Sequence, residues 1–240
     1  MAEILTATRS HDVALQGAIL LYGRSVAEFS YATAHRIEPD AKTGRPVIGA
    51  GTPLNRQALI QAVRQVAEAS LPKGEFLTPN VLSISPTAVT WWCPPGHRRV
   101  FFKCSEFGEC SAVVPHPGLV FQAAHTGFRV FALSGEDRPV PASVLHEPPY
   151  FNTWDNGKIC IGSAHVPKQI DVASIAGWES GFFDSAFTHP NHGNPRVKFE
   201  RGPYAFWKDM LDGRFTDYPK QVLIPMKRTL ADLIAGKLDK

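Results

Sequence analysis

The sequence predicts an α+β fold in which an antiparallel β-meander is flanked by helices, with an N-terminal β extension. Twenty prolines and nineteen glycines divide the 240 residues into short segments, which is typical of strands joined by turns. Helical spacing of apolar residues is confined to residues 52–70 and to the region after residue 171. A hydrophobic fraction of 44% with 20% charged residues indicates a globular chain able to bury a core.

The N-terminal region is predicted to form a β-hairpin extension. Strand-forming residues fill 13–21 and 27–37, and the turn between them at 22–25 includes a glycine and a serine. A polar link over 38–51 follows, which contains two prolines and two glycines before its last residue. We therefore divide the chain into this extension, residues 1–50, and a larger domain, residues 51–240.

The middle of the chain is predicted to be a strand meander. Aromatic and β-branched residues are dense here, and turn residues interrupt them at short intervals. The breaks include a Pro-Pro-Gly sequence at 94–96 and a His-Thr-Gly sequence at 125–127. The predicted strands cover residues 81–84, 88–93, 99–103, 118–123 and 128–133.

Helices are predicted on both sides of the meander. Thr52 is a suitable N-cap for a helix over 52–70, because proline follows it at the first helical position. Asp171 is a suitable N-cap for a helix that extends to about Ala186. Two further helices are expected near the C-terminus, over 204–211 and 229–237.

Composition and charge limit the kinds of partner. The net charge is only +3 and there is no block of basic residues, so neither nucleic acid nor a membrane surface is expected as a partner. The first residues do not have the pattern of a signal peptide, and four cysteines are too few for a disulfide scaffold. We therefore expect a cytoplasmic protein with reduced thiols.

A turn followed by a cysteine stands out within residues 151–162. Asp155-Asn156-Gly157 predicts a chain reversal, because Asn and Gly tolerate positive φ. If the next residues are extended, Ile159 faces one side and Cys160 the other, on the same side as Lys158. An exposed thiol beside a cation can act as a nucleophile, whereas unpaired cysteine is often a buried, inert residue.

Two other chemistries compete for the cysteines. His97, Cys104, Cys110 and His116 form a plausible zinc set by residue type, but they lack the Cys-x-x-Cys spacing of zinc motifs. We expect them to be ordinary surface or core residues.

A cysteine peptidase would pair Cys160 with His165, His189 or His192. Against this, such a nucleophile usually lies at a helix N-terminus, and glycine flanks this short extended run.

Acyl transfer through a thioester is the third option. It requires an exposed cysteine and a donor that stabilises the oxyanion formed when an amine attacks the thioester. The side-chain amide of Asn152, eight residues before Cys160, could supply that donor if the turn folds it back. The alternative for Asn152 is an ordinary turn-capping residue.

Asn152 and the sequence Asn156-Gly157-Lys158-Ile159-Cys160-Ile161 resemble the active-site signature of ubiquitin-conjugating enzymes. In that family a His-Pro-Asn tripeptide precedes the catalytic cysteine, with the same spacing from Asn to Cys. Further segments resemble a bacterial, prokaryotic branch of the family that includes the PRTRC system protein B. They are Trp91-Trp92, residues 117–121, 130–133, 138–139, 148–163 and 187–190.

This resemblance implies a ubiquitin-conjugating-enzyme-like fold and a function. Cys160 would accept a ubiquitin-like protein as a thioester from an adenylating activating enzyme, and would then pass it to an amine. Asn152 would be the oxyanion donor. No metal and no organic cofactor would enter this chemistry, because the activating enzyme consumes the ATP.

The chain departs from the family pattern at several positions. Tyr150-Phe151 replace the His-Pro pair, and Ile161-Gly162-Ser163 follow the cysteine in place of the usual residues. No downstream acidic residue can be assigned from the sequence to deprotonate the amine, and His189 is a candidate substitute. The alternatives are a non-catalytic conjugating-enzyme-like binding module encoded in a multi-gene cassette and, less favoured, the cysteine peptidase.

Overall fold

The computed structural model falls into two compact units, residues 1–75 and 76–240, and each is described by itself. Within the described residues, every helix is too short or too polar to cross a membrane. The described residues are 15–25, 28–54, 57, 60, 76–191 and 195–239.

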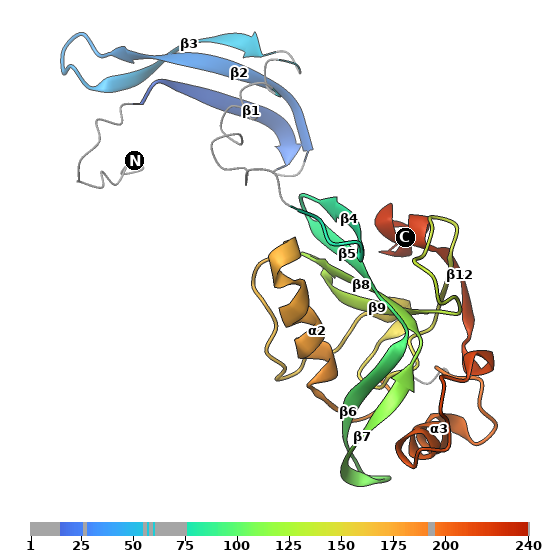
Figure 1. Cartoon of the computed structure of the whole chain (residues 1–240). Coiled ribbons are helices and arrows are strands. Elements are labelled where there is room, and N and C mark those ends of the chain that lie inside the picture. Colours follow the sequence, from blue (N-terminus) through green and yellow to red (C-terminus); the bar gives the residue numbers. More distant parts are fainter. Residues whose placement is uncertain are drawn as a thin grey trace. The chain divides into compact units, whose positions relative to one another are not determined.

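The first unit contains a three-stranded antiparallel sheet in the order β1-β2-β3 (Figure 1). Tyr22 and Tyr31 lie opposite each other on neighbouring strands, and their rings stack with centroids 4.5 Å apart. The pairing of β1 with β2 confirms the predicted hairpin. The strands are β1 Gly17–Ser25, β2 Glu28–Pro39 and β3 Pro46–Leu54.

The third strand of this unit differs from the prediction. β3 occupies residues 46–51 of the expected polar link, because Val47 and Ile48 pair with β2. Thr52 therefore continues a strand instead of capping a helix, and Pro53 is tolerated because β3 is an edge strand. The predicted boundary between residues 50 and 51 falls within β3. Of the helix predicted over 52–70, residues 52–54 are strand, residues 57 and 60 are helical, and the others lie outside the described residues.

The second unit is built on a six-stranded sheet in the order β12-β10-β9-β8-β5-β4, in which all neighbours are antiparallel. The strands expected over 81–84, 88–93, 118–123 and 128–133 all lie in it. Their side chains are mostly buried, which explains why strongly apolar sequence predicted them well. The strands are β4 Val81–Ser85, β5 Ala88–Cys93, β8 Gly118–Ala124, β9 Gly127–Leu133, β10 Val144–His146 and β12 Pro225–Thr229.

A second sheet extends from the first. The hairpin of β6 Gly96–Cys104 and β7 Gly108–His116 continues the direction of β5 and β8 (Figure 1). Prolines at 94, 95 and 117 interrupt the pairing between the two sheets, since proline has no N–H to donate. β11 Ala186–Phe187 pairs in parallel with β6. The polar strand β7 was not predicted, because its register with β6 is needed to recognise it.

The helices of this unit agree with the predictions in position. η2 Val172–Ser174 leads into α2 Ile175–Phe183, and the Asp171 carboxylate caps them by accepting from Ser174 N at 2.8 Å. α3 Gly202–Leu211 packs beside β7, while α4 Leu230–Ile234 is shorter than expected. The remaining short helices are η1 Asp155–Gly157, η3 Lys220–Val222 and η4 Lys237–Asp239. The structure thus confirms a mixed fold of antiparallel sheets with few helices.

Candidate functional site

The turn before Cys160 has the predicted geometry. Asn156 and Gly157 adopt φ of 60° and 74° within η1, so both occupy the left-handed region. A Cβ on Gly157 would lie 2.5 Å from the Val130 carbonyl oxygen, which leaves room only for glycine. Trp154 N donates to Lys158 O at 2.7 Å and closes the reversal. The turn therefore brings the segment after it back alongside Asn152.

The residues after the turn alternate between core and surface. Ile159 is 8% exposed and donates its backbone N–H to Phe128 O at 2.8 Å, which fixes this segment beside β9. Cys160 is exposed, and Ile161 packs partly against the core. This confirms the predicted alternation. The thiol of Cys160 is thus on the surface, unlike the inert buried cysteine that was its alternative.

Cys160 lines an open cavity of about 670 Å³ together with Asn152. The two residues are also joined through the backbone, because Cys160 N donates to Asn152 O at 2.7 Å. The thiol and the amide therefore face the same cavity from adjacent segments. Its walls come from residues 160–165, 184–186, Thr188 and His189, with Lys103 and Asn152.

Hydrogen bonds fix the side-chain amide of Asn152. Its Oδ1 accepts from Thr188 N at 3.1 Å and from Thr188 Oγ1 at 2.8 Å, and its Nδ2 donates to Ala186 O at 2.9 Å. Since a backbone N–H only donates, the atom facing Thr188 must be the carbonyl oxygen. An amide nitrogen carries two hydrogens, and one of them is bonded to Ala186 O. The second hydrogen of Asn152 Nδ2 is the one that would donate a hydrogen bond to an oxyanion.

The residues that replace His-Pro belong to the core. Tyr150 and Phe151 are each 1% exposed. The Phe151 ring meets those of Phe102 and Tyr204 edge-on, with centroids 5.4 and 5.0 Å apart. Asn152, which follows them, has a φ of 57°. Aromatic packing thus anchors the segment that carries the amide, and the strained backbone at Asn152 turns it toward the cavity.

The side chain of Arg196 contacts the loop between Asn152 and Cys160. Its guanidinium is 3% exposed, forms ion pairs with Glu147 and with Asp155 at 3.3 Å, and donates to Thr153 O at 3.4 Å. Burial lowers the pKa of Arg196, while the two carboxylates act in the opposite direction. A single buried cation therefore binds two residues of the loop between Asn152 and Cys160.

The ionisable groups in the cavity differ from those expected next to the cysteine. Lys103, His165, Asp184 and His189 line it. Lys158 is not among the described residues that do so, and its stem lies against Gly127, where an added Cβ would be 3.1 Å from Lys158 Cε. The lysine that lines the cavity together with Cys160 is thus Lys103 from β6.

Asp184 is an acidic residue of the cavity that the sequence did not reveal. It ends α2 as the C-cap, and its Oδ2 accepts from Ser180 Oγ at 2.6 Å. Its position became visible only because α2 ends beside the loop that carries Cys160. The sequence signal, an acidic residue at the end of an amphipathic helix, is too common to identify it alone.

The other candidate residues are not gathered at this cavity. In the β6–β7 hairpin, Cys104 pairs with Gly108 next to the turn, whereas His97 pairs with Pro115 at the opposite end. The four residues considered for zinc are thus divided between the two ends of the hairpin. His192 lies outside the described residues.

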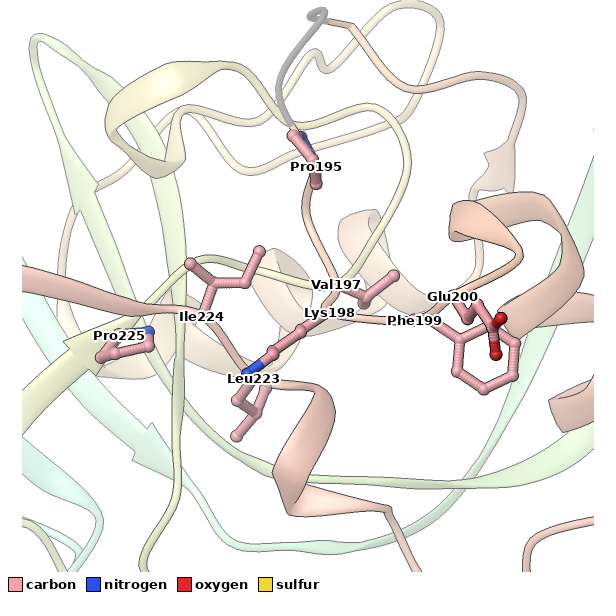
Figure 2. A pocket seen from close by; sticks show the side chains of 8 residues that line it. All are labelled: Pro195, Val197, Lys198, Phe199, Glu200, Leu223, Ile224 and Pro225. Carbon is pink, nitrogen blue, oxygen red and sulfur yellow. The ribbon is translucent and has the colours of Figure 1, made fainter.

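A second cavity of about 670 Å³ has a mainly apolar wall (Figure 2). Pro195 and Val197, the neighbours of Arg196 in the chain, line it on one side. Leu223, Ile224 and Pro225 line it on the other, and Lys198 N donates to Val222 O at 2.7 Å between these segments. The segment that carries Arg196 thus contacts the cysteine loop and also borders this cavity.

Comparison with known proteins identifies the family. The model of prokaryotic E2 family D, where E2 denotes ubiquitin-conjugating enzymes, matches residues 55–226, more than two thirds of the chain. No curated protein and no solved structure matches the chain. The match includes the loop from Asn152 to Cys160, α2 and all the strands of the β6–β7 sheet. This conjugating-enzyme-like protein therefore belongs to prokaryotic E2 family D.

Proposed function

We propose that this protein is a cysteine-dependent conjugating enzyme. It accepts a ubiquitin-like protein as a thioester from an adenylating activating enzyme and transfers it to an amine. The observation that carries the proposal is the exposed Cys160 in a cavity shared with the fixed amide of Asn152. Membership of a conjugating-enzyme-like family supports the same reading.

The first step is exchange between two thiols. The Cys160 thiolate attacks the thioester carbonyl on the activating enzyme, a new C–S bond forms and the old one breaks. The departing thiol takes up the proton that Cys160 lost. Exposure of Cys160 in an open cavity lets an extended C-terminal tail reach the sulfur. The ATP is consumed by the activating enzyme, so this chain needs no cofactor of its own for the step.

The second step is attack by an amine. The tetrahedral intermediate carries an oxyanion, and the second N–H of Asn152 Nδ2 is its donor. Thr188 and Ala186 hold the amide, so little reorientation is needed during the reaction. Asp184 and His189 line the same cavity and are the groups that orient the amine and accept its proton. The C–N bond forms, the C–S bond breaks and Cys160 leaves as a thiolate.

The peptidase alternative has weaker support. His165 and His189 line the cavity with Cys160, but none of the hydrogen bonds in the described part of the chain joins either imidazole to the sulfur. His189 Nδ1 is instead 2.9 Å from Thr188 Oγ1. A nucleophile and its base are expected within hydrogen-bond reach of each other.

The test is a conjugation assay with the cognate activating enzyme, ubiquitin-like protein and ATP, analysed on a non-reducing gel. We expect an adduct that reductant removes and that Cys160→Ala abolishes. Cys160→Ser should give an oxyester that resists reductant, while Cys104→Ala, at a half-buried thiol elsewhere, should leave the adduct intact. Binding without an adduct would establish the non-catalytic module, and cleavage without ATP would establish a peptidase.

A further inference from the structure

We propose that Lys103 is a self-modification site. An acyl group carried by Cys160 is passed within the same molecule to the Lys103 amine, and Glu109 restrains this transfer. The inference rests on the proposed function only in requiring that Cys160 can carry a thioester. A small acyl donor can load that thioester without the partner proteins, so the two proposals can fail separately.

Strand pairing brings Lys103 toward the cysteine. β6 and β11 are parallel neighbours, with Phe101 opposite Ala186 and Phe102 opposite Phe187. Continuing this register places Lys103 beside Thr188. Thr188 donates twice to the Asn152 side chain, and the Asn152 carbonyl accepts from Cys160 N. Neighbouring segments thus lead from Lys103 through Thr188 and Asn152 to Cys160.

The side chains of these segments alternate in the same sense. Phe102, Phe187 and Ile159 are buried in one core cluster. The residue that follows each of them in the chain points the opposite way, so Lys103, Thr188 and Cys160 are directed to one face. All three line the cavity that contains the thiol. Neighbouring strands lie ~4.8 Å apart, and the flexible lysine stem allows the nitrogen to extend over the Thr188 row.

Glu109 pairs with Lys103 and explains why the transfer is restrained. The two residues are opposite each other in the β6–β7 hairpin, with Nζ 2.6 Å from Oε1. This contact raises the pKa of Lys103, mainly through the hydrogen bond that its ammonium donates to Glu109. The paired ammonium has no lone pair with which to attack. The pair is exposed, and exposed ion pairs exchange readily with water, so the ammonium leaves Glu109 at intervals and can then lose its proton to water.

The transfer is chemically balanced and needs no co-reactant. The Lys103 ammonium loses a proton to water, and the neutral nitrogen attacks the carbonyl of the thioester on Cys160. A C–N bond forms and the C–S bond breaks. The Cys160 thiolate is released and is free to be loaded again. The product is a stable amide on Lys103, which reductant does not remove.

Lys158 is the matched control. It is nearer to Cys160 in sequence than Lys103 is, and it is also exposed. Its stem lies against Gly127, and it is not among the described residues that line the cavity. Simple proximity along the chain would favour acylation of Lys158, whereas the shared cavity favours Lys103.

The experiment uses the full chain and a glycine thioester of mercaptoethanesulfonate as the acyl donor, near neutral pH. Peptide mass spectrometry locates adducts before and after reductant. We expect a labile adduct on Cys160 and a stable amide on Lys103. The amide should be lost in Cys160→Ala and Lys103→Arg, should form several-fold faster in Glu109→Gln, and should be unchanged in Lys158→Arg. Both arginine variants keep an exposed charge, so each is expected to fold.

Three results would overturn the inference. They are a stable amide on Lys103 that persists in Cys160→Ala, acylation of Lys158 equal to that of Lys103, and a Cys160 thioester that only hydrolyses. None of them touches the proposed function, which the ATP-dependent assay reports on separately. Conversely, Lys103 acylation from the small donor together with failure of the ATP-dependent assay would support this inference and reject the proposed function.

Discussion

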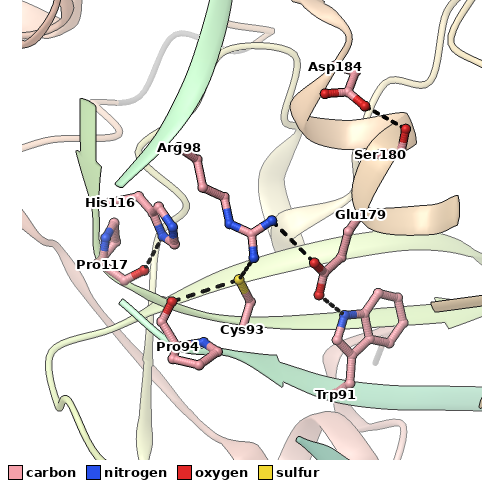
Figure 3. A network of polar contacts seen from close by, with 9 residues as sticks. All are labelled: Trp91, Cys93, Pro94, Arg98, His116, Pro117, Glu179, Ser180 and Asp184. Atoms are coloured by element: carbon pink, nitrogen blue, oxygen red, sulfur yellow. Dashed lines mark hydrogen bonds and ion pairs between the residues drawn. The ribbon is translucent and has the colours of Figure 1, made fainter. Parts of the chain in front are cut away.

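Cys93 and Cys160 are two free thiols of the same structural unit, and each lies close to an apolar strand-like run. Cys93 ends β5 and is 1% exposed, whereas Cys160 follows a turn and is exposed. From the sequence alone, the neighbouring cation Lys158 indicated that Cys160 could be a reactive thiol. In the structure the closest thiol–cation contact of the described residues is at Cys93, where Arg98 Nη2 donates to the sulfur at 3.2 Å (Figure 3).

The surroundings of Cys93 show that a cation does not by itself activate a thiol. Burial, and after it the charge of Glu179, raise the pKa of Cys93 to about 12, although Arg98 partly opposes them. Arg98 is also engaged by Glu179 at 3.4 Å, and Glu179 accepts from Trp91 Nε1 at 3.0 Å (Figure 3). Access to solvent, more than a nearby charge, therefore separates the candidate nucleophile from the core thiol.

The sharpest test of this contrast is alkylation with iodoacetamide near neutral pH. We expect Cys160 to react on the order of 1,000-fold faster than Cys93 in the folded protein, because Cys93 is both inaccessible and almost fully protonated. Peptide mass spectrometry over time gives the two rates. In denaturant the two rates should become similar. Comparable rates in the folded protein would contradict the comparison.

Asn152→Ala tests whether the cavity around Cys160 also supplies an oxyanion donor. Loss of one oxyanion donor typically reduces such a step by about 100- to 1,000-fold. We therefore expect the Cys160 thioester to form while its discharge to free lysine slows by about that factor. The measurement is single-turnover discharge, with thermal unfolding as a control for the lost bonds to Thr188. An equal loss in both steps would assign Asn152 to loop structure alone.

His116 is a buried residue that should resist protonation in the folded protein. His116 is 3% exposed, and burial lowers its pKa from 6.5 to about 4, despite a hydrogen bond to Pro117 O (Figure 3). Between these pH values the unfolded chain binds a proton that the folded protein does not. Stability is therefore present above pH 6.5 and falls as the pH is lowered toward about 4, by about 3 kcal/mol from this group.

Urea unfolding at several pH values would measure this slope. His116→Gln should flatten it, whereas His97→Gln, at an exposed position of the same hairpin, should change it much less. If the His116 variant keeps the full slope, another group is responsible for the acid sensitivity.

Much of the fold followed from sequence where burial dictates the pattern. The strands over 88–93, 118–123 and 128–133 are buried along most of their length, and their apolar runs predicted them directly. β3 and β7 were missed because they are polar or proline-flanked, and their partners create them. Strand pairing is a tertiary property that local composition does not record.

The residues of the candidate site likewise include some that the local sequence predicts and some that only tertiary structure brings together. Asn152 and Cys160 are close in sequence, and the turn between them is encoded locally, so the sequence could predict that they lie side by side. Lys103 and Asp184 reach the cavity through the pairing of β6 with β11 and through the end of α2. Both lie more than twenty residues from Cys160, and charged residues at such distances give no local signal.

The smallest predicted effect concerns the cation at Cys93. Arg98→Met should destabilise the fold by about 2 kcal/mol, because Glu179 loses its charged partner and is 18% exposed. The Arg98 guanidinium also lies 4.6 Å from the centre of the Phe183 ring, and methionine retains only part of this packing.

Arg99→Met is the matched control, since Arg99 is exposed on the same strand and its side chain donates to Ser111 Oγ at 3.4 Å. Its effect on the free energy of unfolding should stay within about 0.5 kcal/mol. Cys93 should remain slow to alkylate in the folded Arg98→Met protein, because burial and not the cation protects it. Fast alkylation of Cys93 in that variant would instead show that Arg98 seals the thiol from solvent.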